Sequence, residues 1–176
     1  GQSELVKVLT GLMTTTRGTV KLGQKDISNA WPADLRQSGI AIIPEDRYAQ
    51  GLCRDMTIAD NCISGYHAEA RFCKMGILNR PAIRQQRDSL VEQYDIRISD
   101  LEGNVSQLSG GNAQKIIIGR EMDSDPEVLI ASQPTRGVDV GSIEFIHQKL
   151  LDFKAQKRSI LLASSELNEI MSLTDR

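Results

Sequence analysis

The stretch that decides the fold is Leu108-Ser109-Gly110-Gly111-Asn112, which lies within QLSGGNAQK at residues 107–115. A helix is expected to follow from residue 112 to about residue 122, because apolar residues there recur at helical spacing. A Ser-Gly-Gly turn at a helix start is a natural anion site, since glycines let phosphate approach the backbone and first-turn N–H groups point outward. Such turns are common, so the stretch needs support from its neighbours.

Apolar strands and helices alternate downstream of this helix. A buried strand is expected at residues 128–131 (VLIA), a helix at about 142–155 and another strand at 159–163. Alternating helices and strands indicate a parallel sheet, so the predicted fold class is mixed α/β.

The chain upstream contains a helix and two strand candidates. Apolar residues at helical spacing predict a helix at residues 4–12 behind Ser3, which can cap its first turn. Residues 18–23 are a short β-prone run between glycines, and residues 40–43 (IAII) are an apolar strand candidate that Pro44 ends.

The β signal disappears between residue 55 and about residue 105. Ile83, Leu90, Val91 and Tyr94 mark one face of a helix whose other positions are polar or charged. We therefore expect a helical insert, whose apolar face packs into a core while neighbouring positions contact a partner.

The composition predicts one soluble globular domain. Of the 176 residues, 40% are hydrophobic and 25% charged, and the formal net charge of -2 argues against DNA or RNA as a partner. The three cysteines form no C-x-x-C pair and are expected to be reduced, and no apolar run approaches the length of a membrane span. Because the chain opens on Gly1-Gln2-Ser3 without Met or a leader, we expect it to be part of a longer protein.

The neighbours of the opening stretch carry a family resemblance. Residues 107–115, followed after one helix by Asp125-Pro126 and the strand at 128–131, resemble the signature-to-Walker-B block of ABC ATPases. Residues 133–141 (QPTRGVDVG) resemble the D-loop region of sugar and nucleoside importers in that superfamily. The resemblance covers essentially the whole chain, including residues 43–47 (IPEDR), 51–52 (GL), 77–80 (ILNR) and 164–167 (SSEL).

The resemblance implies a P-loop NTPase fold of the ABC nucleotide-binding type, with a mostly parallel sheet and an inserted helical subdomain. Residues 1–54 and 106–176 would form the α/β core and residues 55–105 the helical subdomain of one domain. That domain is expected to be truncated at both ends, because the upstream part of the phosphate loop and some strands are missing from the sequence.

In this family two such domains meet head to tail, and the signature of one covers the nucleotide bound to the other. The resemblance therefore assigns an action in trans, on the opposite site, to the signature residues Leu108, Ser109, Gly110, Gly111, Asn112 and Gln114. It also places Asp139 at the D-loop aspartate. The residues that act on the opposite site are thus intact.

The phosphate loop of the chain's own site departs from the family. A Walker A loop reads G-x-x-x-x-G-K-[ST], and only Gly1-Gln2-Ser3 corresponds to it here, with Gln2 at the lysine position. A neutral amide can donate hydrogen bonds to phosphate but supplies no positive charge. Phosphate affinity at this end should therefore fall.

The catalytic positions of the chain's own site are also substituted. Ser132 and Gln133 stand at the Walker B aspartate and at the glutamate that polarises the attacking water. Glu45 stands at the Q-loop glutamine and Ser165 at the switch histidine. A general base contributes about 10²- to 10⁴-fold to rate, so hydrolysis at this site should be very slow.

The implied function is that of an ATP-binding domain of an ABC importer for simple sugars or nucleosides. This half would supply its signature to a partner's catalytic site without being catalytic itself, with ATP as cofactor and Mg²⁺ mainly at the partner site. The implied partners are a second nucleotide-binding domain in the same polypeptide and transmembrane permease subunits. The expected location is cytoplasmic, at the inner face of the cell membrane.

Other interpretations stay open. One is an interaction module that binds no nucleotide and relays motion between ATPase and membrane subunits; another is a soluble ABC protein acting on DNA or ribosomes, which would need basic extensions that the sequence lacks. Glu45-Asp46 is more simply a solvated turn than a metal site, and His147 and His67 are more simply structural or exposed than catalytic.

Overall fold

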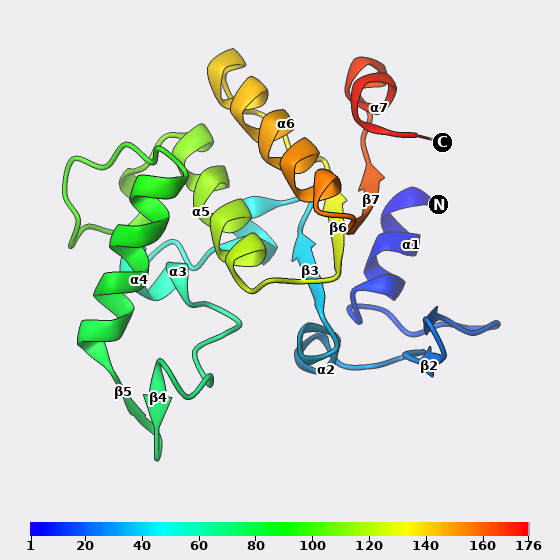
Figure 1. The fold of residues 1–176 in the computed structure, drawn as a ribbon, viewed down its shortest axis with the longest axis horizontal. Helices are drawn as coiled ribbons and strands as arrows, with labels where there is room; N and C mark the ends of the chain where they lie inside the picture. Colours follow the sequence, from blue (N-terminus) through cyan, green and yellow to red (C-terminus); the bar gives the residue numbers. More distant parts are fainter. Residues whose placement is uncertain (176) are drawn as a thin grey trace.

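A computed structural model describes residues 1–175, and a parallel sheet forms the centre of the molecule (Figure 1). β3 (Ile40–Ile43), β6 (Val128–Ser132) and β7 (Ser159–Ala163) lie in the order β3-β6-β7, and both strand pairs are parallel. The strands predicted from the apolar runs are therefore confirmed, and with them the mixed α/β fold class.

Two long helices cover one face of the sheet. α5 (Gly110–Asp123) and α6 (Val140–Ala155) share the larger core with Ala41 and Ile43 of β3, and Leu150 of α6 is buried there. Both helices begin two residues earlier than their apolar spacing predicts, because a glycine and a valine already adopt helical conformation before the periodic residues start.

The opposite face of the sheet is covered by two shorter helices. α1 (Gln2–Leu9) and α2 (Pro32–Gln37) pack there, and Leu35 joins Ile40 and Ile42 in a second core. Successive residues of β3 thus enter different cores, which is why a continuous apolar run rather than an alternating one forms this strand.

The middle of the chain contains the helices α3 (Ile58–Cys62) and α4 (Arg80–Gln93) joined by turns, and lies to one side of the sheet in Figure 1. The two helices contact each other, and a small separate core forms around Phe72 and Ile83. A short 3-10 turn, Val105–Gln107, then leads to α5. The subdomain boundaries at residues 55 and 105 stay a prediction.

A hairpin in this middle part was not predicted. β4 (Cys73–Lys74) pairs antiparallel with β5 (Ile77–Leu78). Met75 and Gly76 between them both have positive φ, at 53° and 80°, as the tightest hairpin turns require. The expectation that β structure is absent from residues 55–105 is therefore wrong, because strands of two residues are too short to show a period.

The first helix and the first strand candidate also differ from expectation. α1 begins at Gln2, so Ser3 lies inside its first turn and is not its cap. The β-prone run at residues 18–23 contributes only β1 (Lys21–Leu22), which pairs with β2 (Lys25–Asp26) in a hairpin outside the central sheet.

The remaining elements lie at the strand ends. Arg47–Gly51 forms a single π-helical turn after β3, and α7 (Leu167–Leu173) follows β7. In residues 1–175, none of the helices combines the length and apolar character that crossing a membrane requires.

Candidate functional site

The carboxyl ends of the three parallel strands carry the positions predicted to be substituted catalytic residues. Glu45 lies two residues after β3, Gln133 directly after β6, and Ser165 two residues after β7. Parallel strands end at the same edge of a sheet, and open α/β sheets bind ligands at that edge. Three separate loops therefore bring these predicted positions to one side of the molecule.

Gln133 and Ser165 are in direct contact. The Gln133 Oε1 atom accepts hydrogen bonds from the Ser165 backbone N and from Ser165 Oγ, both at 3.1 Å. Gln133 has a φ of 50°, which is uncommon for a residue other than glycine, and its backbone N donates to Ala163 O at 2.7 Å. The loop after β7 thus already engages the Gln133 amide oxygen, and β7 engages its backbone N–H.

Ser3 and Glu45 are also brought together. Ser3 Oγ donates to Glu45 Oε2 at 3.0 Å, and Arg136 Nη1 lies 3.2 Å from Glu45 Oε1. The ion pair is largely open to solvent, with side-chain exposures of 65% for Arg136 and 36% for Glu45, and such surface pairs contribute little to stability. Glu45 thus lies in a partly exposed turn and contacts both α1 and the loop after β6.

This end of the sheet does not fit Mg²⁺ with a polyphosphate. Mg²⁺ takes oxygen ligands in near-octahedral geometry, usually with one or two carboxylates. Glu45 already binds Ser3, Ser132 is only 3% exposed, and the Gln133 amide is held by the following loop. Gln2 is exposed and neutral. Among the described residues, no group of three or more His, Cys, Asp or Glu side chains is placed to hold a metal ion.

The signature segment has a defined geometry at the start of α5. Ser109 caps the helix, and its Oγ accepts hydrogen bonds from Asn112 N at 3.3 Å and Asn112 Nδ2 at 3.0 Å. Asn112 Oδ1 in turn accepts from Arg97 N at 2.9 Å. The backbone N–H groups of Gly110 and Gly111 donate to no acceptor within residues 1–175. Free first-turn donors at a helix start suit an anion.

The D-loop residue Asp139 lies against this segment. It caps α6, with Oδ1 accepting from Ser142 N at 3.0 Å and Oδ2 from Ser142 Oγ at 2.8 Å. The Ser142 side-chain hydrogen bond, followed by the backbone one, lowers the pKa of Asp139. A Cβ on Gly111 would lie only 2.4 Å from Ser142 Oγ and 2.6 Å from Asp139 Oδ2. The absence of a side chain at Gly111 is what allows this approach.

The other signature residues face inward. Leu108 is half-buried and packs against the larger core, and Gln114 is only 2% exposed. The Gln114 side chain is therefore not on the surface that carries Ser109, and we omit it from the proposed contact with an opposite nucleotide.

Arg47 is a residue that the motif analysis did not single out. Its Nη1 atom donates to Gly110 O at 2.7 Å, so it touches the signature segment directly. Residues 43–47 were noticed only as part of the family resemblance. A guanidinium that binds backbone carbonyls leaves no pattern of its own in a sequence.

Glu121 anchors the other end of α5 and was also missed. The Glu121 side chain is fully buried. Its Oε1 atom lies 3.0 Å from both Arg36 Nη2 and Arg120 Nη2. Its Oε2 atom accepts hydrogen bonds from Tyr66 OH at 2.8 Å and from Ile42 N at 3.2 Å. Burial alone would raise the pKa of this carboxyl, but the two arginines and these hydrogen bonds outweigh burial and lower it. The network joins α5 to α2, β3 and the middle part of the chain.

A second buried carboxylate supports the loop after β6. Glu169 Oε1 on α7 accepts from Thr135 Oγ1 at 2.8 Å and lies 3.0 Å from His147 Nε2 on α6. His147 is half-buried, so this contact agrees with a structural role, and His67 is exposed.

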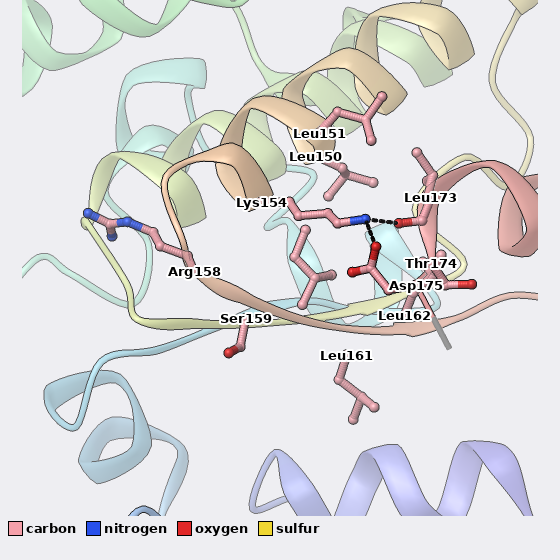
Figure 2. A pocket seen from close by; sticks show the side chains of 11 residues that line it. Leu150, Leu151, Lys154, Arg158, Ser159, Leu161, Leu162, Leu173, Thr174 and Asp175 are labelled. Carbon is pink, nitrogen blue, oxygen red and sulfur yellow. Dashed lines mark hydrogen bonds and ion pairs between the residues drawn. The ribbon is translucent and has the colours of Figure 1, made fainter.

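A wide cavity lies away from all these residues (Figure 2). It has a volume of about 740 Å³ and is bounded by α6, β7 and the chain after α7. Leu161 and Lys154 line it, and Lys154 Nζ binds Asp175 Oδ1 at 2.6 Å. None of the predicted site residues contributes to it, so cavity size does not locate the site.

Comparison with known proteins gives consistent matches. The family model described as "ABC transporter" matches residues 1–136. The chain is 44% identical over its whole length to the guanosine import ATP-binding protein NupO of Bacillus subtilis, covering 34% of that protein. It is 38% identical to a glucose import ATP-binding protein of Haloferax volcanii, covering 32% of it. The chain thus spans about a third of the length of the curated relatives it matches.

A solved structure has the same architecture. The crystal structure of a nucleotide-free ATP-binding cassette from an ABC transporter superposes with a TM-score of 0.76 at 25% identity. The match covers 99% of this chain and 70% of that one.

Proposed function

This chain belongs to the ABC transporter family, and from that premise we propose that it is the ATP-binding part of an importer that completes a partner's catalytic site rather than its own. The observation that carries the proposal is the contrast between two groups of residues. Ser109 and the free N–H groups of Gly110 and Gly111 are arranged for an anion, whereas Gln133 offers a neutral amide that Ser165 already occupies.

The chemistry of the chain's own site supports this division. Hydrolysis of ATP needs a group that accepts a proton from the attacking water, and an amide is not a base at neutral pH. Polyphosphate binding needs positive charge, which Gln2 does not supply. We therefore expect ATP and Mg²⁺ to act mainly at the partner site, where the other domain supplies the Walker residues.

The relatives point to the class of cargo. NupO is named for guanosine import and the Haloferax protein for glucose import, and both are similar to this chain over its whole length. We propose a nucleoside or simple sugar as the transported substrate. The partners are then a second nucleotide-binding domain, in the same polypeptide, and permease subunits at the cytoplasmic face of the membrane.

The proposal is tested by paired substitutions in the full-length protein assembled with its membrane partner. Ser109→Glu places a negative charge where the opposite γ-phosphate would lie, and we expect ATPase activity to fall about 100-fold or more, as when one donor to a developing charge is lost. Ser106→Glu, an equally exposed position three residues earlier, is the matched control. Gln133→Ala should change activity less than about twofold, since an amide contributes no base catalysis.

Equal losses from Ser109→Glu and Gln133→Ala would contradict the asymmetric assignment. So would full activity of Ser109→Glu.

A second candidate is an interaction module that binds no nucleotide of its own. The contacts of Ser3 with Glu45 and of Gln133 with Ser165 favour it, because they satisfy these side chains without a ligand. ATP binding by the full-length protein, measured with the partner's Walker lysine replaced, distinguishes the two: bound ATP excludes the module, and no binding supports it.

A further inference from the structure

Arg47 connects the signature segment with the loop that carries Asp139. Its Nη1 atom donates to Gly110 O at 2.7 Å and to Gly137 O at 3.5 Å, and its Nη2 atom donates to Arg136 O. Gly110 opens α5, while Arg136 and Gly137 belong to the loop between β6 and α6. A guanidinium holds its donors in a rigid planar fork, so these carbonyls are kept at a fixed spacing.

Two glycines make room for this side chain. A Cβ on Gly110 would lie 3.0 Å from Arg47 Nη1 and 3.0 Å from Gly137 O. Gly137 has a φ of 64°, which glycine adopts without strain, and a Cβ there would lie 3.3 Å from Arg47 Nη2. The guanidinium therefore fits between two backbone segments that approach each other closely.

Asp46 and Glu45, the two residues before Arg47, connect Arg47 to residues of the chain's own nucleotide site. Asp46 Oδ1 accepts hydrogen bonds from Ala49 N and Tyr48 N, both at 3.0 Å, and these bonds lower the pKa of Asp46. They fix the turn from which Arg47 extends. Glu45 binds Ser3 at 3.0 Å, so the same segment reaches the start of α1.

We propose that Arg47 is a positioning residue for the nucleotide on the opposite domain, because it holds the signature segment and the Asp139 loop in one fixed relation and is linked through Glu45 to Ser3. The inference rests on the proposed function and deepens it. Arg47 itself does not touch the nucleotide; it acts through the backbone of Gly110 and Gly137.

The consequence of losing Arg47 is a displaced signature rather than an unfolded domain. Its carbonyl partners lie at a partly exposed position, where water can replace the lost donors. Donors that stabilise a reacting phosphate must be placed closely, and a displacement of about 1 Å can lower a rate by about 100-fold. ADP lacks the γ-phosphate that the signature would contact, so its binding should be insensitive to this displacement.

The test compares Arg47→Met with Arg54→Met in the full-length protein assembled with its membrane partner. Arg54 is a matched control because both arginines lie against the Tyr48 ring: the distance from the guanidinium to the ring centre is 4.9 Å for Arg54 and 5.9 Å for Arg47. Unlike Arg47, Arg54 is exposed and makes no hydrogen bond within residues 1–175. We expect Arg47→Met to lower kcat about 10- to 100-fold and to raise KM for ATP, which carries the γ-phosphate, about 10-fold, and Arg54→Met to change neither.

Binding measurements separate positioning from loss of structure. Arg47→Met should weaken binding of ADP with beryllium fluoride, which mimics the γ-phosphate, about 10-fold, and leave ADP binding within about twofold. Arg47→Lys, which keeps the charge but not the fork, should fall between wild type and Arg47→Met.

Two results would overturn the inference: equal kcat for the two methionine variants, or equal weakening of ADP and of its beryllium fluoride complex. The experiments distinguish a failure of this inference from a failure of the proposed function. If Ser109→Glu abolishes activity while Arg47→Met does not, only the role of Arg47 is lost; if Ser109→Glu is active, the proposed function is lost first.

Discussion

The amino end of α5 and the carboxyl end of β6 are held in different ways. At α5, Ser142 Oγ and Asp139 Oδ2 come so near Gly111 that a Cβ there would lie 2.4 and 2.6 Å from them, and buried Glu121 fixes the far end of the helix. At β6, Gln133 is held by hydrogen bonds to exposed Ser165. A side chain at an open strand end can thus be exchanged without moving its neighbours, whereas a side chain added at Gly111 must displace Asp139 and Ser142.

The largest expected effect concerns the anchor of α5. Glu121→Gln should lower the free energy of unfolding by about 3 to 5 kcal/mol, because it leaves buried Arg120 and half-buried Arg36 without their counter-charge. Urea denaturation of this chain measures the loss. Glu92→Gln, at an exposed position of α4, is the control and should stay within about 0.5 kcal/mol of wild type.

If Glu121→Gln were as stable as Glu92→Gln, α5 would not be anchored by charge, and the contrast between the two regions would be weaker. If the Glu121→Gln domain still folds, full-length protein that carries it should also show reduced ATPase activity, because the signature segment lies at the start of α5.

The next largest effect is on ATPase activity and concerns Gly111 at the amino end of α5. Gly111→Ala should reduce ATPase activity of the full-length protein about 10- to 100-fold, because the added Cβ displaces Asp139 and Ser142. Stability should change by less than about 1 kcal/mol, since alanine favours the helix and offsets part of the clash.

Gly141→Ala is the matched control for Gly111→Ala. A Cβ on Gly141 would lie 3.6 Å from Asp139 Oδ1, which is an ordinary contact, and the residue is also in the first turn of a helix. Activity of Gly111→Ala equal to that of Gly141→Ala would show that the close approach is not required.

The smallest effect is the pH dependence of Asp139. Its folded-state pKa is lowered by the Ser142 hydrogen bonds, so the ionised carboxylate stabilises the folded chain above the unfolded-state pKa of about 3.9. This contribution is lost as the pH falls through the lower folded-state pKa. Asp139→Asn keeps an acceptor for Ser142 N but does not titrate.

Thermal melting of wild type and Asp139→Asn at pH 6 and near pH 3 measures this pH-dependent contribution to stability. Wild type should exceed the variant in Tm at pH 6, and the difference should shrink at the lower pH. A difference that stays constant with pH would mean that Asp139 acts only as an uncharged helix cap.

Two of the three central strands, β3 and β6, could be predicted because they are buried on both faces. The runs at residues 40–43 and 128–131 are continuously apolar, so they differ from helices by length and from exposed strands by the lack of alternation. The hairpin around Met75 could not be predicted, since its strands are short and exposed and its apolar residues are not in a core.

The candidate site could be predicted by residue type but not by contact. The sequence identified Glu45, Gln133 and Ser165 as substituted positions, yet their hydrogen bonds to one another and to Ser3 depend on loops that meet only in the folded chain. Gln114 looked like part of the signature surface, but the direction of its side chain follows from helix packing.

Arg47 and Glu121 were missed for different reasons. Arg47 binds backbone carbonyls, which every residue has, so no partner residue type reveals it. Glu121 follows Arg120 in a helix and resembles a surface glutamate until Arg36 and Tyr66 are brought to it from distant parts of the chain.

The contact between Gln133 and Ser165 has a mechanical consequence. β6 and β7 are paired up to Ser132 and Ala163, and the Gln133 side chain adds a cross-link just beyond that last pair. When two paired strands are pulled along their length, the tension concentrates at the ends of the pairing. The two hydrogen bonds at that end therefore tie the loop that leads to α6 to the loop that leads to α7.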